Sequence, residues 1–394
     1  MLTPYLPYPL YSGGQIRTYN LLKHLSEKHE ITLFSFIRSE NERNYIPQLR
    51  EFCREVKLFK KRPPWSFTSL FLSATTIYPL VVCMYYQKNL KEEIQRAIER
   101  EHFDLIHAET FYVMPNIPQN HIPTILVEQT IEYLVYKHFT EQVRFPLLKS
   151  LMNFDVKKIY FWEKKFWQRA TRVVAMSEAD KNVMQSHVPR LTVDIVPNGV
   201  DTSFFSKEKK FLQDNEKIVL FVGNFKWLQN REAVNILIQE VWPKIQNKLR
   251  RTKLWIVGRF PPKEILNYSS DSIKVSADIE DIRDVYKKAD VMLAPIFGPG
   301  GTRYKILEAM AVGIPVVTTS TGIEGLDVVH GKEALIADNP SKLAEETIKL
   351  LTNMRLYKTL AINGRKIIEN KYNWEMISAS LDKIYKKAIY DRQS

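Results

Sequence analysis

The sequence predicts a doubly wound α/β protein built from two similar domains. Three observations lead to this class. Short β-branched runs alternate with helical patterns from one end of the chain to the other. Most of these runs are continuously apolar, as expected of parallel strands that are covered on both faces. The runs also fall into two successive sets of six, and helices between such strands build doubly wound sheets.

The two sets of predicted strands are separated by a turn. The first set comprises Ile31–Ile37, Val56–Phe59, Leu105–Ala108, Thr124–Glu128, Arg172–Met176 and Val193–Val196. The second set comprises Ile218–Val222, Leu254–Val257, Ile273–Val275, Val291–Ala294, Val316–Thr319 and Ala334–Ala337. A Pro-Asn-Gly turn at Pro197–Gly199 lies between them. We therefore expect an N-terminal domain of residues 1–197, a C-terminal domain of residues 198–372 and a last helix over residues 373–394.

Composition limits the class further. With 394 residues, 45% of them hydrophobic and 26% charged, the chain is globular in composition and long enough for two or three domains of roughly 150 residues. Its two cysteines, Cys53 and Cys83, form neither a metal-ligand pattern nor a disulfide framework. The N-terminus has no basic region followed by an apolar stretch, so it does not read as a secretory signal. Both features indicate a cytoplasmic protein.

Basic residues cluster beside aromatic residues in two places. The formal net charge of +13 attracts polyanions, and the excess is concentrated at Lys57–Arg62 and along Arg144–Arg169. Such surfaces suit an anionic membrane, on which the protein would be peripheral. A solvated helix with one face in the core explains them as well, and both interpretations stay open. No nucleic-acid partner is expected, because no binding motif accompanies the charge.

The apolar segment Trp65–Tyr86 raises the question of a membrane-spanning helix. Such a helix requires about 20 predominantly apolar residues, but here serine and threonine side chains recur and Pro79 lies near the middle. We expect a buried helix followed by a loop, or a segment that lies at a membrane interface.

The most informative segment runs from Pro295 to Pro315. A strand enters a glycine-rich turn here, and the pattern predicts a helix over about Arg303–Val312. Thr302 is the expected N-cap, and Gly313 ends the helix. Bare backbone N–H groups, that of Gly301 among them, then lie at a helix N-terminus, which is a ready site for an anion.

Two cations at the start of this helix point to a phosphate. Arg303 and Lys305 oppose the helix dipole in the first turn, and a phosphate between them would remove the conflict. Glu308, about one turn further, can accept hydrogen bonds from ribose hydroxyls. The alternative is an ordinary capped helix with a Lys305–Glu308 pair on its surface.

This segment resembles the C-terminal signature of the family 4 retaining glycosyltransferases. The resemblance implies the glycosyltransferase-B fold, in which two Rossmann-like domains face a cleft that holds a nucleotide-diphosphate sugar. The family pattern has two glutamates, and Glu308 matches the second, which binds the ribose. Gly300 stands at the position of the first. The segment is similar to a subgroup with a glycine-rich, Arg-x-Lys version of the loop.

Further stretches resemble the same family along nearly the whole chain. FVGNFKWLQNREAVNIL is similar to the first strand, loop and helix of the donor domain, LWIVGRFPP to the next nucleotide-facing loop, and SADIEDIRDVYKKADVMLAP to the segment that holds the base. WEMISASLDKIY is similar to the last helix, which crosses back to the N-terminal domain. The donor-binding residues that the resemblance implies are Gly14, Arg17, Gly223, Asn224, Lys226, Gly258, Arg259, Gly301, Thr302, Arg303, Lys305 and Glu308.

The N-terminal match to the family is SGGQIRTYNLLKHL. In the family a Gly-Gly pair opens a helix that faces the donor phosphates, and the backbone approaches closely because no Cβ intervenes. Gly14 and Arg17 are the residues carried over, and the alternative is a simple turn before an amphipathic helix. The family also has a β-strand before this loop, so here that strand is very short or the start is truncated.

Two glutamates end strands of the N-terminal domain. Glu109 follows DLIHA and Glu128 follows TILV. Many relatives carry an acceptor-side histidine near the position of Glu109. His107 faces the same side of the strand as Glu109, but only Glu109 is expected to reach the rim. We predict that Glu109 acts in catalysis and binds the acceptor, with Glu128 and Glu132 as further acceptor contacts. A charge at a loop end is the alternative for Glu132.

Missing motifs narrow the chemistry. The chain has no Asp-x-Asp, no Gly-x-Gly-x-x-Gly after a strand, no Walker A motif and no His-Glu-x-x-His. These absences argue against a metal-dependent glycosyltransferase of the A fold, a dehydrogenase, a P-loop NTPase and a zinc hydrolase. We expect neither a metal ion nor a cofactor.

The resemblance implies a retaining glycosyltransferase of the hexosyltransferase type. It would transfer a sugar from a nucleotide-diphosphate sugar to a glycan or lipid-linked acceptor, with Glu109, Arg303 and Lys305 as catalytic residues. The cations would stabilise charge on the leaving diphosphate. Two alternatives stay open: a sugar-nucleotide 2-epimerase on the same fold, which needs no acceptor, and a non-catalytic, membrane-associated protein that binds nucleotide sugars.

Overall fold

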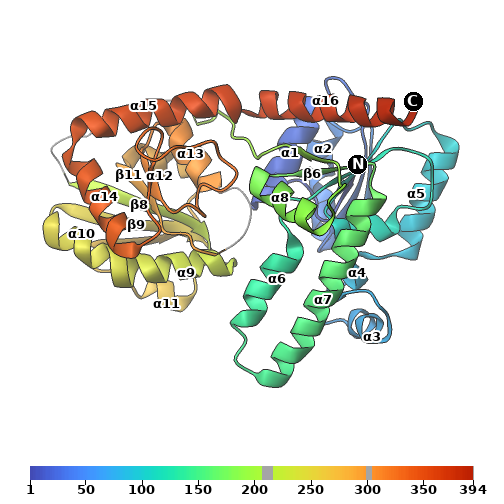
Figure 1. The fold of residues 1–394 in the computed structure, drawn as a ribbon, viewed down its shortest axis with the longest axis horizontal. Coiled ribbons are helices and arrows are strands. Elements are labelled where there is room, and N and C mark those ends of the chain that lie inside the picture. The colour runs from blue at the N-terminus through green and yellow to red at the C-terminus, as the bar shows by residue number, and fades with distance from the viewer. Residues whose placement is uncertain (206–215, 299–303, 394) are drawn as a thin grey trace. The chain divides into compact units, whose positions relative to one another are not determined.

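The computed structural model describes residues 1–205, 216–298 and 304–393 (Figure 1). The chain folds into two compact units, unit 1 (Met1–Pro197 with Glu375–Ser394) and unit 2 (Asn198–Trp374). Each unit contains one parallel sheet with helices between its strands. The predicted class, a doubly wound α/β protein of two domains, is therefore confirmed.

The sheet of unit 1 has the strand order β3-β2-β1-β4-β5-β6-β7 over the described residues, and its neighbouring strands are parallel. Its strands are β1 (Leu2–Thr3), β2 (Thr32–Ile37), β3 (Glu55–Lys60), β4 (Ile106–Glu109), β5 (Thr124–Val127), β6 (Arg172–Ala175) and β7 (Val193–Ile195). The sequence pattern missed β1, which pairs with β2 and β4. Two residues are too few for a periodicity, and a very short first strand is what the structure contains.

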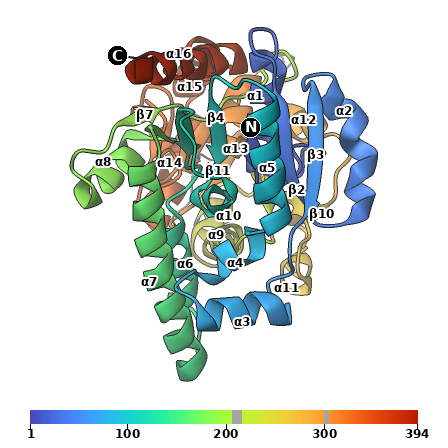
Figure 2. The same ribbon diagram turned by 90° about the vertical axis from the view of Figure 1, so that its right-hand side faces the viewer.

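The helices of unit 1 fill the connections between these strands. They are α1 (Gly13–Leu25), α2 (Ile46–Arg50), α3 (Phe67–Thr75), α4 (Leu80–Tyr85), α5 (Lys88–Arg100), α6 (Glu132–Glu141), α7 (Pro146–Arg169), α8 (Glu178–His187) and α16 (Trp374–Gln393), with 3-10 turns at Glu40–Tyr45 and Phe111–Asn116. Helices α6 and α7 lie side by side and extend away from the sheet (Figures 1 and 2).

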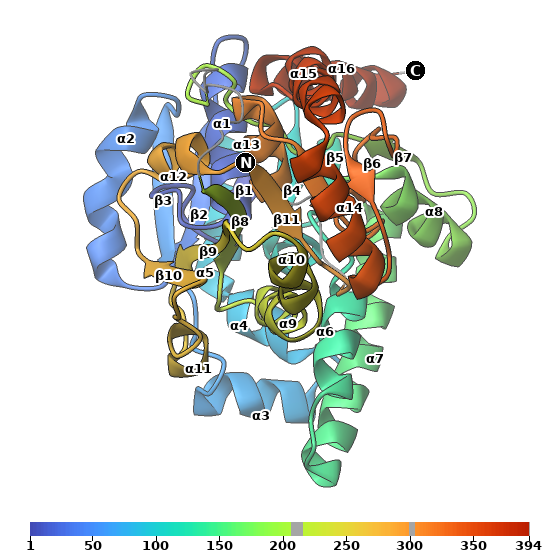
Figure 3. The same ribbon diagram turned by 90° about the vertical axis from the view of Figure 1, so that its left-hand side faces the viewer.

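Unit 2 repeats the same strand order with its own strands. The order over the described residues is β10-β9-β8-β11-β12-β13. The strands are β8 (Lys217–Asn224), β9 (Thr252–Arg259), β10 (Ile273–Ala277), β11 (Val291–Ala294), β12 (Val316–Thr318) and β13 (Leu335–Ile336). The helices are α9 (Leu228–Ile236), α10 (Trp242–Lys248), α11 (Lys263–Leu266), α12 (Ile282–Lys288), α13 (Tyr304–Val312), α14 (Pro340–Thr352) and α15 (Met354–Lys371), with a π-helical turn at Leu237–Val241. Helices α10 and α14 lie side by side (Figure 3).

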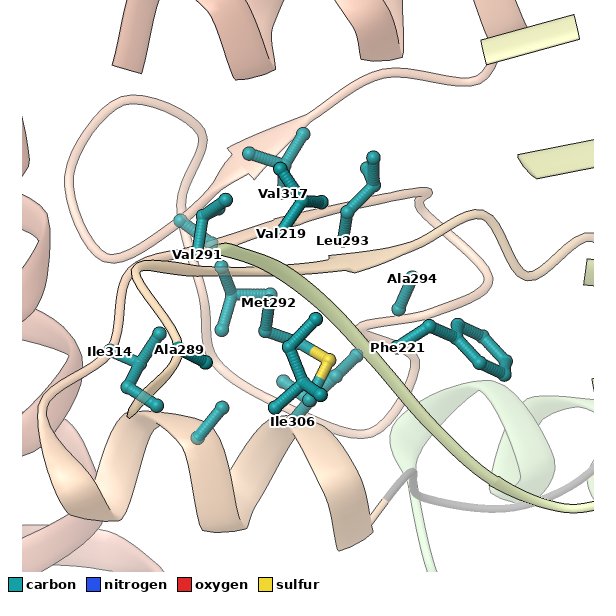
Figure 4. Packing of buried hydrophobic residues seen from close by; sticks show 14 of the residues in the cluster. Val219, Phe221, Ala289, Val291, Met292, Leu293, Ala294, Ile306, Ile314 and Val317 are labelled. Atoms are coloured by element: carbon teal, nitrogen blue, oxygen red, sulfur yellow. The ribbon is translucent and has the colours of Figure 1, made fainter. Parts of the chain in front are cut away.

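Helix α13 is fixed against the sheet of unit 2 by an apolar core. Ile306 on α13 packs with Met292 on β11 and Phe221 on β8, and all three are buried (Figure 4). The helix stops at Gly313, whose φ of +86° is a left-handed conformation that favours glycine. The start of α13 is therefore held at one place relative to the ends of β8 and β11.

The segment Trp65–Tyr86 forms two short helices rather than one buried helix and a loop. Helix α4 is buried through Val81 and Val82, as expected, but α3 leaves its aromatic side chains exposed. The prediction of a buried helix therefore holds for α4 and is wrong for α3, and the alternative of a segment at a membrane interface stays a prediction. Across residues 1–205, 216–298 and 304–393, no helix combines the length and the apolar character needed to span a bilayer.

Candidate active-site regions

In each of the two parallel sheets, the order in which the chain adds strands reverses at an equivalent position. In both orders the first strand of the sheet lies beside the fourth: β1 beside β4 in unit 1, and β8 beside β11 in unit 2. In open α/β sheets ligands bind outside the carboxyl ends of the strands at such a reversal point. Several site residues predicted from the sequence follow strands near these two reversal points, among them Glu109 in unit 1 and Gly223 and Asn224 in unit 2.

In unit 2 the predicted glycines lie on paired strand ends. Gly223 and Asn224 on β8 are in register with Gly258 and Arg259 on β9. A Cβ atom added to Gly258 would lie 1.8 Å from the carbonyl oxygen of Gly223 and 2.6 Å from the ring of Phe225. Close approach of the two strands, rather than of a ligand, is thus enough to require Gly258.

Lys305 is buried near the end of β8. Its Nζ donates a hydrogen bond to Oδ1 of Asn230 at 2.7 Å and lies 4.2 Å from the centroid of the Phe221 ring. Asn230 in turn donates from Nδ2 to the carbonyl oxygen of Asn224 at 2.8 Å. The ammonium group of Lys305 is thus buried and fixed by an amide oxygen and an aromatic ring. It does not form the surface ion pair with Glu308 that the sequence left as an alternative.

The carboxylate of Glu308 is oriented by a tyrosine. Tyr286 on α12 donates from its hydroxyl to Oε2 of Glu308 at 2.7 Å. Burial raises the pKa of Glu308, against the opposing effects of the Tyr286 hydrogen bond and the charge of Lys305. Tyr286 belongs to the stretch that resembles the base-holding segment, so it connects that stretch to the glutamate expected at the ribose.

The remaining donor-binding predictions divide into two groups. Lys226 is exposed, and its Nζ lies 3.6 Å from the ring centroid of Phe260, next to half-buried Arg259. The others lie outside the described residues; they are Gly301, Thr302 and Arg303, with Gly300 beside them.

In unit 1, Gly14 lies in the first turn of α1, after the N-cap Ser12. A Cβ atom at Gly14 would lie 2.2 Å from the hydroxyl of Tyr5 and 2.7 Å from Oε1 of Gln129. The Nε2 group of Gln129 donates to the Tyr5 hydroxyl at 2.6 Å and to Oε2 of Glu109 at 2.7 Å. Gly14 therefore makes room for a hydrogen-bonded chain that ends on Glu109.

Glu109 is fully buried, which corrects the prediction that it reaches the rim of the sheet. Its other oxygen contacts Nε2 of His107 at 3.0 Å, and Nδ1 of His107 contacts the Tyr385 hydroxyl on α16 at 2.5 Å. The expectation that His107 and Glu109 face the same side is thus confirmed. Each oxygen of Glu109 has a protein partner, so the side chain supports its neighbours rather than presenting itself to an acceptor.

The protonation states of this pair follow from burial and contact. Burial lowers the pKa of His107, although Glu109 acts to raise it. Burial alone would raise the pKa of Glu109, but the hydrogen bonds from His107 and Gln129 and the charge of Arg17 hold it below its ordinary value. The consistent arrangement is a neutral His107 that donates from Nε2 to an ionised Glu109 and accepts at Nδ1 from Tyr385.

Glu128 is also buried, which corrects its assignment as an acceptor contact. Its oxygens accept from Nε1 of Trp167 at 3.0 Å and from the backbone N–H of Phe111 at 3.3 Å. Glu163 on α7 accepts from the backbone N–H groups that start α6, including that of Glu132 at 2.7 Å. Burial, and the charge of Glu163, raise the pKa of Glu128 well above its ordinary value.

Arg17 is an internal residue rather than a donor contact. It is fully buried, and its guanidinium donates to the carbonyl oxygens of Pro197 at 2.8 Å and Val196 at 3.0 Å. These carbonyls lie just after β7, within the same unit. The guanidinium thus fixes the end of the sheet, which does not fit the donor-binding role that the family resemblance implied for Arg17.

The sequence did not reveal the groups that orient the candidate residues. These are Asn230 and Tyr286 in unit 2, and Tyr5, Gln129, Glu163 and Tyr385 in unit 1. Asn230 follows the β8 loop within a stretch that resembles the family, so it could have been included. Tyr385 ends the stretch that resembles the last helix of the family, but its contact with His107, 278 positions away, could not be predicted from the sequence.

Two family models match the chain. The model described as Glycosyltransferase Family 4 matches residues 11–204, and the model described as Glycosyl transferases group 1 matches residues 216–353. Together with the two doubly wound sheets, these matches define an enzyme of the glycosyltransferase-B class. The chain belongs to the family 4, group 1 glycosyltransferases.

Similar proteins and solved structures also indicate a glycosyltransferase. An uncharacterized 44.6 kDa protein from the cps region of Klebsiella pneumoniae is 23% identical over 393 residues, which cover 96% of this chain and 97% of that protein. The capsular polysaccharide biosynthesis glycosyltransferase CapM of Staphylococcus aureus is 25% identical over 263 residues, 62% of this chain and 68% of CapM. The structure of Anabaena HepE in complex with UDP-glucose shares the fold, with a TM-score of 0.65, 16% identity and 98% coverage of both chains. The protein is a glycosyltransferase that uses a nucleotide sugar.

Proposed function

We propose that the protein transfers a hexose from a nucleotide-diphosphate sugar to a glycan or lipid-linked acceptor, with retention of anomeric configuration and without a metal ion. One observation carries the donor half of this proposal. Lys305 and Glu308 lie on one helix at the reversal point of a doubly wound sheet, and each is oriented by a partner, Asn230 and Tyr286. A buried cation followed one turn later by a carboxylate suits a diphosphate joined to a ribose.

The proposed roles follow from charge. Lys305, with Arg303, binds the diphosphate and stabilises the negative charge that develops on it as the sugar leaves. Glu308 accepts hydrogen bonds from the ribose hydroxyls with the oxygen that Tyr286 leaves open to other donors. A phosphate oxygen of the leaving group takes the acceptor proton, so the remaining catalytic task is to position the two substrates.

Glu109 enters the proposal as a positioning residue. Its carboxylate holds His107 and Gln129, and Gln129 holds Tyr5 against Gly14. This places the ordered turn at the start of α1 at the reversal point of unit 1. A loss of Glu109 should therefore act on kcat through that turn and leave nucleotide affinity unchanged.

The class of acceptor is supported by the relatives. CapM is described as acting in capsular polysaccharide biosynthesis, and the Klebsiella relative is encoded in a cps region. We propose an acceptor of the same chemical kind, a growing glycan or a glycan carried on a lipid. The UDP-glucose complex of HepE makes uridine-diphosphate sugars the first donors to try.

The test is a nucleotide-release assay over a panel of UDP-, GDP- and ADP-sugars, with and without lipid-linked acceptors and with EDTA. The expected result is acceptor-dependent release that EDTA leaves unchanged, with a product whose anomeric proton in NMR matches the donor configuration. Inversion, or inhibition by EDTA, would contradict the proposal. Release of a 2-epimer without acceptor would indicate an epimerase, and nucleotide binding without turnover would indicate a non-catalytic binding protein.

A further inference from the structure

Unit 1 exposes a large apolar surface on α3 and α7, which we name the α3–α7 surface. Trp65 and Phe67 are 81% and 83% exposed. Its members are Trp65, Phe67, Leu70, Phe71, Ile77, Leu147, Leu148, Leu151, Phe154 and Phe161, all of them exposed. Scattered apolar residues need no explanation, but a group of large, strongly exposed ones on two helices that are bonded to each other indicates an interaction site.

Helix α3 is held in place by polar contacts from α7. Lys158 Nζ donates to the carbonyl oxygens of Ser73 and Thr76 at the end of α3, the latter at 2.9 Å. Asp155 accepts from the backbone N–H of Leu80, which starts α4, at 2.9 Å. Trp162 adds a bond from Nε1 to the carbonyl oxygen of Ile77 at 2.8 Å. These contacts fix the segment between α3 and α4 at both of its ends. The exposed face of α3 is therefore held in a defined position within unit 1.

The apolar residues of α7 form one stripe beside α3. Leu147, Leu151, Phe154 and Phe161 are spaced by four, three and seven positions, which places them on one helix face. The side chains that hold α3 occupy neighbouring positions on α7, and the C-terminal end of α3 meets this helix, as Figure 2 shows. Two segments separated in sequence therefore expose large apolar side chains on helices that are bonded to each other.

The charge around this surface is strongly positive. Arg144, Lys149, Lys157, Lys158, Lys164, Lys165 and Arg169 are the basic residues between positions 144 and 169, where Asp155 and Glu163 are the acidic ones. Both carboxylates point inward, to α4 and to the start of α6. Lysine side chains also run along the aromatic rings: the Nζ of Lys158 is 5.1 Å from the Phe154 centroid, and that of Lys165 is 4.6 Å from the Trp162 centroid.

We propose that the α3–α7 surface docks on an anionic lipid bilayer. Exposed aromatic and leucine side chains would enter the boundary between headgroups and acyl chains, and lysines would reach lipid phosphates with their charged ends. The positive excess favours this partner over a second copy of the chain, because two copies would bring the same lysines together. The proposal does not depend on the reaction, although it would place a lipid-linked acceptor at the protein surface.

The test is co-sedimentation of the full chain with vesicles of phosphatidylcholine alone or mixed with phosphatidylglycerol. Binding to the anionic vesicles is expected, with weaker binding to the neutral ones and a loss of binding in high salt. The double variant Phe67→Ser/Phe71→Ser should weaken binding by on the order of tenfold or more. Val329→Ser/Ile362→Ser removes exposed apolar residues of unit 2 and is the matched control; it should bind as the parent does.

Charge is tested separately. Each of Lys157→Gln, Lys164→Gln and Lys165→Gln should weaken binding to anionic vesicles by about fivefold, whereas Lys383→Gln and Lys387→Gln on α16 should not. Circular dichroism checks that every variant is folded. Absence of vesicle binding, equal binding by all variants, or a dimer in light scattering that Phe67→Ser/Phe71→Ser dissociates would overturn the proposal.

Discussion

The reversal points of the two sheets have the same strand order but use their charged residues differently. In unit 1, Glu109 and Glu128 are buried, and their oxygens bind groups of the same unit. In unit 2, Lys305 bonds Asn230 and lies over the ring of Phe221, and Glu308 accepts from Tyr286. The same place in a doubly wound sheet can therefore hold an internal support or a candidate ligand site.

This difference teaches that position along a strand does not define the role of a carboxylate. Glu109 follows a strand as the sequence predicts, but β4 ends against the chain of Tyr5, Gln129 and Tyr385. The role depends on which groups pack over the strand end. Three substitutions test the comparison, the largest expected effect first.

Glu128→Ala should have the largest effect if Glu128 is an internal support. It removes the acceptor for Trp167 Nε1 and for the N–H of Phe111 and leaves a cavity, so the free energy of unfolding should fall by about 3–5 kcal/mol. Glu128→Gln is the comparison variant: it fills the same space and its amide oxygen keeps one of the two bonds, but its NH2 group cannot accept the other, so it should lose only about 1–2 kcal/mol. Urea unfolding measures both. Equal losses of unfolding free energy in the two variants would contradict the role of Glu128 as an internal support.

Glu132→Gln should change the pH dependence of stability. Burial raises the pKa of Glu132 from 4.5 to about 7. The folded state therefore holds a proton that the unfolded chain releases, and the stability from this group is fully present below pH 4.5 and is lost as pH rises to 7. The loss is up to about 3 kcal/mol. The variant should lack this decline in unfolding free energy; parallel pH profiles of variant and parent would show that Glu132 is not the cause.

Glu308→Gln should have the smallest of the three effects, and it should act on ligand affinity instead of stability. An amide still accepts from Tyr286 but forms a weaker bond to ribose hydroxyls, so the Kd for a nucleoside diphosphate should rise about five- to tenfold, roughly 1–1.4 kcal/mol. Calorimetric titration measures it, with Glu345→Gln on the exposed face of α14 as the control. A Kd equal to that of the control would place the ribose elsewhere.

Much of the fold could be predicted from the sequence. Continuous apolar runs located twelve strands to within two residues at each end, because buried parallel strands leave that pattern in any chain. The stop of α13 at Gly313 was predicted because a left-handed residue there favours glycine. Strand β1 was missed, since its two residues belong to the sheet only through β2 and β4.

The site was less predictable, because its chemistry depends on contacts distant in sequence. Arg17 was carried over from the family as a donor-binding residue, but it donates to carbonyl oxygens about 180 positions away. Lys305 stays a predicted donor-binding residue, and its burial against Phe221 could not be predicted because that contact needs the tertiary fold. The sequence left open for the same reason whether α3 is buried or lies at an interface, and only the tertiary packing shows that its aromatic side chains are exposed.

The most direct test compares one residue from each region in a single experiment. Lys305→Ala and Glu109→Gln are titrated with UDP by calorimetry, after thermal unfolding has shown that both variants are folded. We expect Lys305→Ala to weaken binding on the order of 100-fold, about 2.7 kcal/mol, and Glu109→Gln to bind as tightly as the parent. Unchanged affinity in Lys305→Ala, or an equal loss in Glu109→Gln, would contradict the assignment of the donor site to unit 2.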